Sequence, residues 1–259
     1  MGQLQIMISE LLGTMMLIII GNGVCFSVSH QKMFANQPGK WVVIALAWGL
    51  AVFMGVTVAG AMGGPGHINP AVSIYSAISN AIKTNGESTI ELAYIPFQLA
   101  GAMLGQFLLN FINWKFIIET AQEGSATTRG AHATAPAFRN KEDKATIFNF
   151  SYELVGTAVL LTMILTFGHG INTAWTGAMG PIPVTLVIMA LGMALGSATG
   201  YALNPARDLG PRLVYALLRP MMNKKSGVIL ATPDWAYAWV PVVAPATAGV
   251  VFGVLGLMI

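Results

Sequence analysis

Six apolar stretches, each about 20 residues long, constrain the fold of this chain more than any other feature of its sequence. About 20 residues of helix, rising 1.5 Å per residue, cross the hydrocarbon core of a bilayer. Only 9% of the 259 residues are charged, whereas a typical soluble domain carries roughly 25%. The sequence therefore predicts an all-α membrane protein and excludes a soluble globular domain. The expected spans are Met7–Val28, Trp41–Ala61, Ile90–Ile112, Ile147–Phe167, Pro183–Gly200 and Trp235–Ile259.

The chain offers little for redox, metal or nucleic-acid chemistry. Its single cysteine, Cys25, permits neither an intrachain disulfide nor a cluster of thiolate ligands. Its net charge of +3 comes from basic residues that are scattered through short polar gaps and form no basic stripe. We therefore expect no cofactor, no metal and no nucleic-acid partner.

Two further apolar stretches, Asn69–Asn80 and Asn204–Leu218, are too short to cross a bilayer, and each begins with Asn-Pro-Ala. An Asn-Pro pair often marks a turn. It also suits a helix start, because Asn caps the helix and Pro at the first helical position has no N–H to leave unpaired. Its occurrence twice, each time after an apolar span, favours two half-length helices. The polar gaps Asn113–Thr146 and Pro211–Asp234 are expected to be loops outside the membrane.

The two halves of the chain resemble each other outside these motifs as well. The segment Ser9–Thr14 (SELLGT) matches Tyr152–Thr157 (YELVGT). Such a repeat fixes the architecture. Each half holds three spans, so the second half enters the membrane upside down relative to the first. We expect one domain, residues 1–259, made of inverted repeats that cover about residues 1–125 and 145–259. The glycine spacing of the third span also recurs in the sixth, at Gly101, Gly105, Gly249 and Gly253.

The segments His67–Val72 (HINPAV) and Gly200–Asp208 (GYALNPARD) together resemble the paired signature of the major intrinsic proteins, in particular their glycerol facilitator, or aquaglyceroporin, branch. The resemblance covers essentially the whole chain. It implies the aquaporin-like fold: six transmembrane helices plus two re-entrant half-helices in an inverted repeat. It also implies a homotetramer in the plasma membrane, with both termini in the cytoplasm. Each subunit of such proteins holds one pore, which passes water and small uncharged solutes without energy coupling.

The two Asn-Pro-Ala motifs lie at the pore centre in proteins of this kind. Half-helices whose N-termini meet there present two positive dipole ends, each equivalent to about half an elementary charge. As in aquaporin-type pores generally, these ends repel cations and protons. The Asn amides offer N–H donors to a passing oxygen. The residues that the resemblance assigns to the motifs are Asn69, Pro70, Ala71, Asn204, Pro205 and Ala206.

Arg207 breaks the symmetry of the two motifs, because the equivalent place in the first copy holds Val72. Residues three apart on a helix share a face, so Arg207 is expected to point along the pore with Asn204. An arginine that snorkels to the membrane interface is the structural alternative. The resemblance implies a selectivity filter of four residues, which are Trp48, Gly192, Tyr201 and Arg207.

Gly192 stands where the water-selective branch carries His, so the resemblance implies room for a three-carbon solute. Helix packing is the structural alternative, because Gly192, Gly196 and Gly200 form a small-residue stripe. The chain also departs from the family pattern in two places. Tyr201 stands where glycerol facilitators carry Phe, which adds a hydroxyl to the filter. Gly64-Pro65-Gly66 replaces the usual Ser-Gly-Ala before the first motif.

Further residues are candidates for lining or supporting the pore. Ionisable side chains within a membrane are functional candidates, and Glu10 and Glu153 hold equivalent places in the two repeats. They could form a proton relay. The favoured interpretation is that they accept hydrogen bonds from backbone N–H groups of the half-helix segments, which cannot stay unpaired in lipid. His67 and Asp208 are assigned to pore lining or structural support. The remaining histidines lie in polar gaps and are expected to be solvated: His30, His132 and His169.

The charge distribution conflicts with the implied orientation. Cytoplasmic gaps usually carry the excess of Lys and Arg. With both termini in the cytoplasm, Lys83 alone falls in a cytoplasmic gap, and nearly all other basic residues fall outside.

These observations predict a passive channel for glycerol and other small uncharged solutes, such as water, dihydroxyacetone, undissociated lactic acid, urea or hydrogen peroxide, that excludes ions and protons. An ion- or proton-coupled secondary transporter is the alternative, because inverted repeats and broken helices occur there too. An integral membrane enzyme is a third class. We expect no enzymatic activity, because no Ser-His-Asp ordering, paired carboxylates or His-rich cluster supports it.

Overall fold

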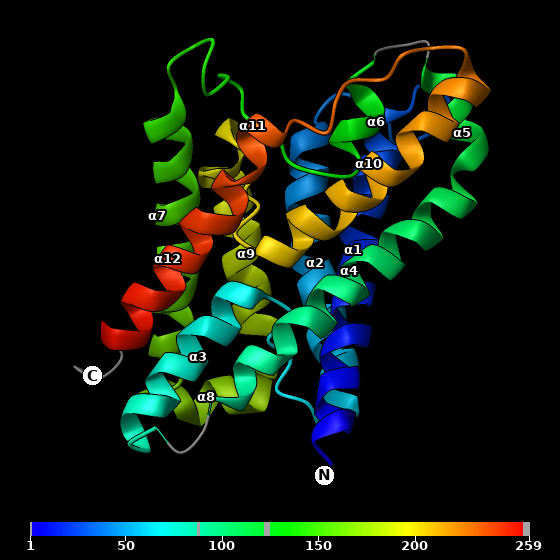
Figure 1. Cartoon of the computed structure of the whole chain (residues 1–259). Coiled ribbons are helices and arrows are strands. Elements are labelled where there is room, and N and C mark those ends of the chain that lie inside the picture. The colour runs from blue at the N-terminus through cyan, green and yellow to red at the C-terminus, as the bar shows by residue number, and fades with distance from the viewer. Residues whose placement is uncertain (1, 87–88, 122–124, 256–259) are drawn as a thin grey trace.

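The computed structural model describes residues 2–86, 89–121 and 125–255, and every regular element within these ranges is a helix (Figure 1). This confirms the predicted all-α fold. Within the described ranges, five helical segments are long and apolar enough to cross a bilayer. They are α1 (Gln3–Ser29), α2 (Lys40–Ala61), the short helix η1 (Ile90–Ala93) continued by α4 (Tyr94–Ile112), α7 (Thr146–Phe167), and α11 (Trp235–Ala238) followed by α12 (Val240–Leu255).

The fifth expected span is built differently from the prediction. Its helix, α9 (Ile182–Ala194), ends six residues before Gly200, and a short helix η3 (Gly196–Ala198) follows it. Gly200 then takes a φ of +80°, which turns the chain toward the second Asn-Pro-Ala motif. Helix α8 (Asn172–Met179) precedes α9 and meets it at an angle of 91°. Only the two helices together are long and apolar enough to count as a sixth span.

The two helices that follow the Asn-Pro-Ala motifs begin where the sequence predicts, but only the first, with 14 residues, is half-length, whereas the second has 22. Helix α3 (Pro70–Lys83) and helix α10 (Pro205–Ser226) start near the centre of the molecule and run toward opposite ends (Figure 1). The prediction of a loop from Pro211 onward was wrong, because α10 continues as a helix to Ser226. Proline disfavours a helix interior, but Tyr215 and Met222 are fully buried, and this packing holds the helix together.

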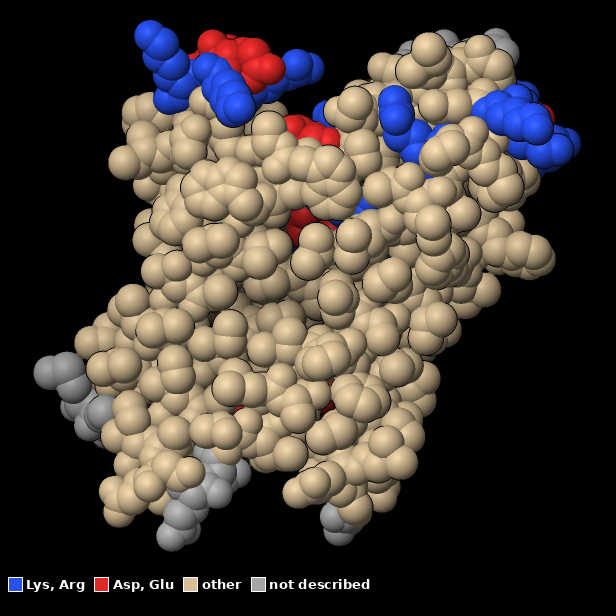
Figure 2. Space-filling view, in the orientation of Figure 1, with Lys and Arg blue, Asp and Glu red and all other residues tan. Residues whose placement is uncertain are grey.

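The polar gap between α4 and α7 also contains helices, namely α5 (Trp114–Thr120) and α6 (Thr127–Gly130). Lysine and arginine side chains gather at this end of the molecule (Figure 2). The start of α1 and the end of α12 lie at the other end (Figure 1). The structure thus reproduces the charge asymmetry that the sequence shows.

Glycine residues allow the long helices to cross closely. A Cβ atom on Gly13 of α1 would lie 2.8 Å from the carbonyl oxygen of Gly55 on α2, and a Cβ on Gly55 would lie 2.7 Å from the carbonyl oxygen of Gly13. The side chain of Ile68 packs into the same crossing, with its Cγ2 atom 2.8 Å from that Gly13 position. The backbones of α1 and α2 therefore touch next to the first Asn-Pro-Ala motif.

The two glycine pairs that echo each other in the sequence do not occupy equivalent places. A Cβ on Gly105 of α4 would lie 2.7 Å from the carbonyl oxygen of Met15 on α1. A Cβ on Gly249 of α12 would instead lie 2.6 Å from the carbonyl oxygen of Ala71 on α3. One pair therefore packs on a long helix and the other on the first half-helix, so the same spacing serves different contacts in the two halves.

The prediction that the gap histidines are solvated was wrong for two of them. His30 and His132 are fully buried, and both rings pack against Phe26, with centroid distances of 5.3 and 5.5 Å. Burial lowers the pKa of His132 to about 4, because a charged imidazolium loses its hydration there. His169 is half-buried, and its Nδ1 atom lies 2.6 Å from the carbonyl oxygen of Leu165.

The α1–α2 crossing predicts that Gly13→Ala destabilises the protein. The added methyl group would clash with the Gly55 carbonyl oxygen and the Ile68 side chain, and such overpacking costs about 1–3 kcal/mol. We expect a lower midpoint of thermal unfolding in detergent. Gly23→Ala on the same helix is the control, because the nearest atom to its new Cβ lies 3.7 Å away. Equal midpoints for the two variants would contradict the crossing.

Candidate functional site

The site begins with the capped N-termini of the two half-helices. The side-chain Oδ1 of Asn69 accepts a hydrogen bond from the backbone N–H of Ala71 at 2.9 Å. The Oδ1 of Asn204 accepts from the N–H groups of Ala206 and Arg207 at 3.0 and 3.1 Å. Each Asn is the N-cap of its helix, and Pro follows at the first helical position. The N-cap interpretation of the two motifs is therefore confirmed.

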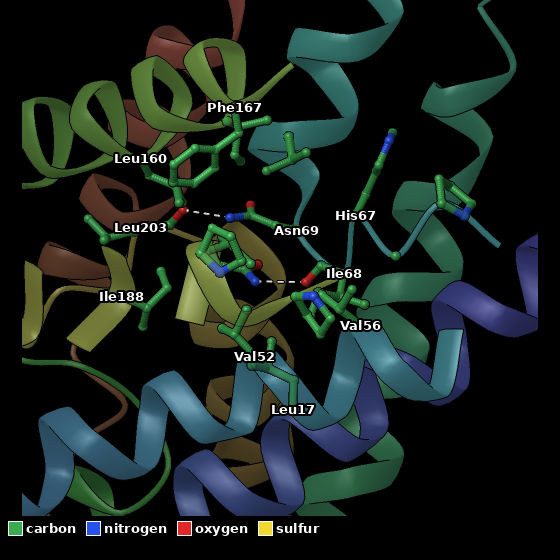
Figure 3. A pocket seen from close by; sticks show the side chains of 18 of the residues that line it. Leu17, Val52, Val56, His67, Ile68, Asn69, Leu160, Phe167, Ile188 and Leu203 are labelled. Atoms are coloured by element: carbon green, nitrogen blue, oxygen red, sulfur yellow. Dashed lines mark hydrogen bonds between the residues drawn. The ribbon is translucent and has the colours of Figure 1, made fainter. Parts of the chain in front are cut away.

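The two caps also bind each other's segments. The Nδ2 of Asn69 donates to the carbonyl oxygen of Leu203 at 2.9 Å, and the Nδ2 of Asn204 donates to the carbonyl oxygen of Ile68 at 2.8 Å (Figure 3). Ile68 and Leu203 have φ values of +44° and +50°, which non-glycine residues adopt only at a cost of about 1–3 kcal/mol. Two reciprocal hydrogen bonds thus join the halves of the chain at their strained turns.

Two buried carboxylates hold the backbone that precedes the motifs. Glu10 accepts from the N–H groups of His67 and Ile68, both at 2.7 Å. Glu153 accepts from the N–H groups of Ala202 and Leu203 at 3.0 and 2.9 Å. Both side chains are fully buried. Both glutamates thus accept hydrogen bonds from the backbone N–H groups of the half-helix segments, as the favoured interpretation of the sequence predicted.

Gln98 is a supporting residue that sequence reasoning missed. Its Nε2 donates to Glu10 at 2.8 Å and to the hydroxyl of Ser73 at 2.9 Å. The Nδ1 of His67 lies 3.2 Å from the same hydroxyl, and the ring packs edge-on against Tyr94. His67 therefore both braces its loop and lines a cavity. An amide in the middle of an apolar span was the signal in the sequence that could have identified Gln98.

In the second half of the chain, a buried ion pair supports the site where Gln98 does so in the first half. Asp208 and Arg212 are fully buried, and the Nε of Arg212 donates to Asp208 at 2.7 Å. Arg212 also donates to the carbonyl oxygen of Thr134 at 2.8 Å, and the backbone N–H of Thr134 donates to Asp208 at 2.8 Å. Asp208 therefore fastens the loop after α6 to α10. The four-residue spacing of Asp208 and Arg212 was the sequence signal for this pair.

Two cavities meet at Arg207. The larger, of about 740 Å³, contains the two motif asparagines and extends between apolar side chains such as Val52, Leu160 and Ile188 (Figure 3). The smaller, of about 440 Å³, lies toward the end that carries the loops after α1 and α6. Arg207 is the one described residue that lines both. It therefore lies between the two cavities.

Three of the four residues expected in a filter line the same cavity. Trp48 and Tyr201 line the larger cavity beside Arg207. The guanidinium carbon of Arg207 lies 4.0 Å from the centroid of the Trp48 ring, a distance at which a cation and an aromatic face attract each other. Arg207 is only 5% exposed, so its charge lies inside the protein and has not reached the surface.

Gly192 does not open directly into either described cavity. A Cβ at this position would lie 2.8 Å from the Cζ and the hydroxyl oxygen of Tyr201 and 3.0 Å from the Cβ of Ala45. The space that the missing side chain leaves is therefore occupied by the Tyr201 ring, contrary to the expectation that it stands open for solute. The Tyr201 hydroxyl is buried there and has no hydrogen-bond partner among the described residues.

Two capped half-helices that meet N-terminus to N-terminus, among long apolar helices, define a channel with the aquaporin fold. The family model described as "Major intrinsic protein" matches residues 1–255. The chain belongs to this family, whose members are membrane channels.

Its relatives place it nearer to one branch. The chain is 41% identical over 260 residues to the "Probable glycerol uptake facilitator protein" of Mycoplasmoides gallisepticum, covering 98% of this chain and 97% of the relative. It is 41% identical over 236 residues to the "Glycerol uptake facilitator protein" of Streptococcus pneumoniae, covering 91% of each. The crystal structure of the aquaglyceroporin from Plasmodium falciparum matches with a TM-score of 0.76 and 29% identity, covering 98% of this chain and 95% of that one.

The bracing carboxylates predict that Glu153→Gln destabilises the fold. The amide keeps one acceptor oxygen but turns an NH₂ group toward the N–H of Ala202 or Leu203, and each buried donor left unpaired costs about 1–3 kcal/mol. We expect less folded protein after detergent extraction and a lower unfolding temperature. Glu142→Gln, at an exposed side chain, is the control. A Glu153→Gln protein as stable as the control variant would contradict the bracing role.

Proposed function

We propose that the protein is a passive channel for glycerol and other small uncharged solutes. The names of its relatives support glycerol as the solute. One observation carries the proposal: Asn69 and Asn204 each donate a hydrogen bond to the backbone just before the other's helix, and both line a cavity that reaches Arg207. This arrangement places polar donors along one side of an otherwise apolar passage.

The path runs through the larger cavity, past the two asparagines, past Arg207 and into the smaller cavity. Each asparagine Nδ2 has two hydrogens, and one of them bonds the opposite carbonyl group. The second is left to donate to a solute oxygen. Val52, Leu160 and Ile188 supply an apolar surface in the same cavity. A polyol presents carbon on one side and hydroxyl groups on the other, and it matches both surfaces at once.

Cations and protons are excluded by fixed positive charge at two levels. The N-termini of α3 and α10 converge at the asparagines, and each contributes about half an elementary charge. We place the constriction of the passage at Arg207, between the two cavities, where it adds a full charge 4.0 Å from the Trp48 ring. A water molecule that accepts hydrogen bonds from both asparagines is held as an acceptor, which interrupts a chain of water molecules along which a proton could pass.

The same chemistry defines a range of solutes: water, urea, hydrogen peroxide, dihydroxyacetone and lactic acid in its undissociated form. An anion such as lactate is attracted to Arg207, but it must shed its hydration in a narrow and largely apolar site. We therefore propose that an acid crosses only when protonated, so that its flux rises as the pH falls.

The alternative of an ion- or proton-coupled transporter is not supported, because the family is one of channels. A coupled carrier needs a titratable or ion-binding centre at the midplane, whereas the groups at this centre are asparagine amides. The two nearby carboxylates, Glu10 and Glu153, are fully buried and accept backbone hydrogen bonds. We propose that the protein has no catalytic activity of its own.

We further propose a homotetramer in the plasma membrane, with both termini in the cytoplasm. We also propose two inverted repeats at residues 1–125 and 145–259, of which residues 1, 87–88, 122–124 and 256–259 lie outside the described residues. Exposed apolar side chains on α2 and α4, among them Leu46, Leu50, Leu104 and Leu108, offer surfaces for lipid and for neighbouring copies. The paired roles of Glu10 with Glu153 and Asn69 with Asn204 support the repeats. The basic end of the molecule then faces outward, against the usual rule.

The proposed function is tested with purified protein in liposomes. Protein-dependent swelling in glycerol, measured by light scattering, is expected to be equally fast with and without a sodium or proton gradient. Uphill accumulation of glycerol, or a rate that depends on the gradient, would support a coupled transporter and contradict the proposal.

The constriction predicts the behaviour of Arg207→Ala. Removing the guanidinium widens the narrowest point and removes its positive charge, so larger and cationic solutes are expected to enter relative to glycerol. The variant is expected to fold, because Val72 is accepted at the equivalent position of the first motif. Arg139→Ala, at an exposed side chain, is the control. A folded Arg207→Ala protein with unchanged discrimination would show that Arg207 is not part of the filter.

A further inference from the structure

Trp41 contacts two of the expected filter residues, Gly192 and Tyr201, and does not line the larger cavity. It is the second residue of α2, and its Nε1 donates to the carbonyl oxygen of Gly192 at 2.9 Å. That carbonyl belongs to the last turn of α9, where helix carbonyl groups lack helical partners. The N–H of Leu195 bonds the carbonyl of Leu191, and the indole of Trp41 bonds the next one. Trp41 therefore caps the end of the helix that supports Tyr201.

The ring of Trp41 also contacts Tyr201 directly. The two ring centroids are 5.9 Å apart and the planes meet at 69°, the edge-to-face geometry in which aromatic rings attract each other. Both rings rest on the same glycine, because a Cβ on Gly196 would lie 2.9 Å from the Cζ2 of Trp41 and 2.6 Å from the Cδ1 of Tyr201. Gly192 and Gly196 thus provide a surface on which the two rings pack side by side.

Tyr201 depends on such packing for its position. Its hydroxyl has no hydrogen-bond partner among the described residues, and its φ of +34° is strained for a residue with a side chain. Contacts of the ring with α9 and with Trp41 therefore fix where it lies. Trp41 itself lines the smaller cavity, while Tyr201 lines the larger one beside Arg207.

We propose that Trp41 is a positioning residue of the filter, which fixes Tyr201 against α9 and thereby sets the widest solute that the channel accepts. The proposal rests on the proposed channel function. It assigns to Trp41 the discrimination between a three-carbon polyol and longer ones. Loss of the indole frees the Gly192 carbonyl and leaves the Tyr201 ring without its edge-on neighbour, so the passage beside Arg207 becomes less well defined.

The test compares solute ratios in liposomes that contain the wild type, Trp41→Phe, Trp41→Ala or the control Trp235→Phe. Trp235 is half exposed. The measured quantity is the permeability to the five-carbon polyol xylitol divided by that to glycerol, for protein that elutes as a single folded species. We expect this ratio to rise about tenfold in Trp41→Ala, within the range by which pockets discriminate one methylene. Trp41→Phe, which keeps a ring but loses the N–H, is expected to give a smaller rise, and the control none.

A second comparison shows whether Trp41 acts through Tyr201. In a Tyr201→Ala background, Trp41→Phe is expected to leave the ratio unchanged. Full additivity of the two substitutions would overturn the proposal. So would a Trp41→Phe protein in which all fluxes fall together at a constant ratio, because that is the result of a purely structural role. Absence of any protein-dependent glycerol flux in the wild type would instead overturn the proposed function itself.

Discussion

Every backbone N–H and carbonyl group at the middle of a membrane must find its partner within the protein, because lipid offers none. Two half-helices that start there leave their first N–H groups and the preceding strained turns unpaired. Glu10 and Glu153 satisfy the turns, and Asn69 and Asn204 cap the helices. Because these four side chains pair the backbone groups, α3 and α10 can begin in the middle of the membrane without leaving N–H groups unpaired. The packing of α3 and α10 depends on them.

In the proposed channel, the groups that satisfy the backbone also create the conditions for conduction. The asparagines use one amide hydrogen to hold the opposite turn and leave the other for a solute. Carboxylates buried behind the turns balance the positive helix ends without entering the passage, and the Asp208–Arg212 pair fastens the loop beyond the constriction. The proposal thus assigns structural support and solute contact to different side chains around the same short segments.

The sequence predicted the features that depend on local chemistry. Asn before Pro predicted both N-caps, and the matched Glu10 and Glu153 predicted bracing carboxylates. Features that depend on tertiary packing were missed. Burial of Tyr215 and Met222 extends α10 past Pro211. Periodic glycines do not reveal which neighbour they face, so the matching spacing in α4 and α12 did not show that one pair packs on α1 and the other on α3. Likewise, a polar gap gave no sign that His132 folds back against Phe26, or that Tyr201 fills the space beside Gly192.

We propose that the paired asparagines and the converging helix ends let neutral solutes pass and stop protons. The most direct measurement follows glycerol flux and an imposed pH gradient in the same liposomes, with a pH-sensitive dye sealed inside. We expect rapid protein-dependent glycerol entry, while the pH gradient decays no faster than in liposomes without protein. A pH gradient that collapses in proportion to the amount of conducting protein would contradict it.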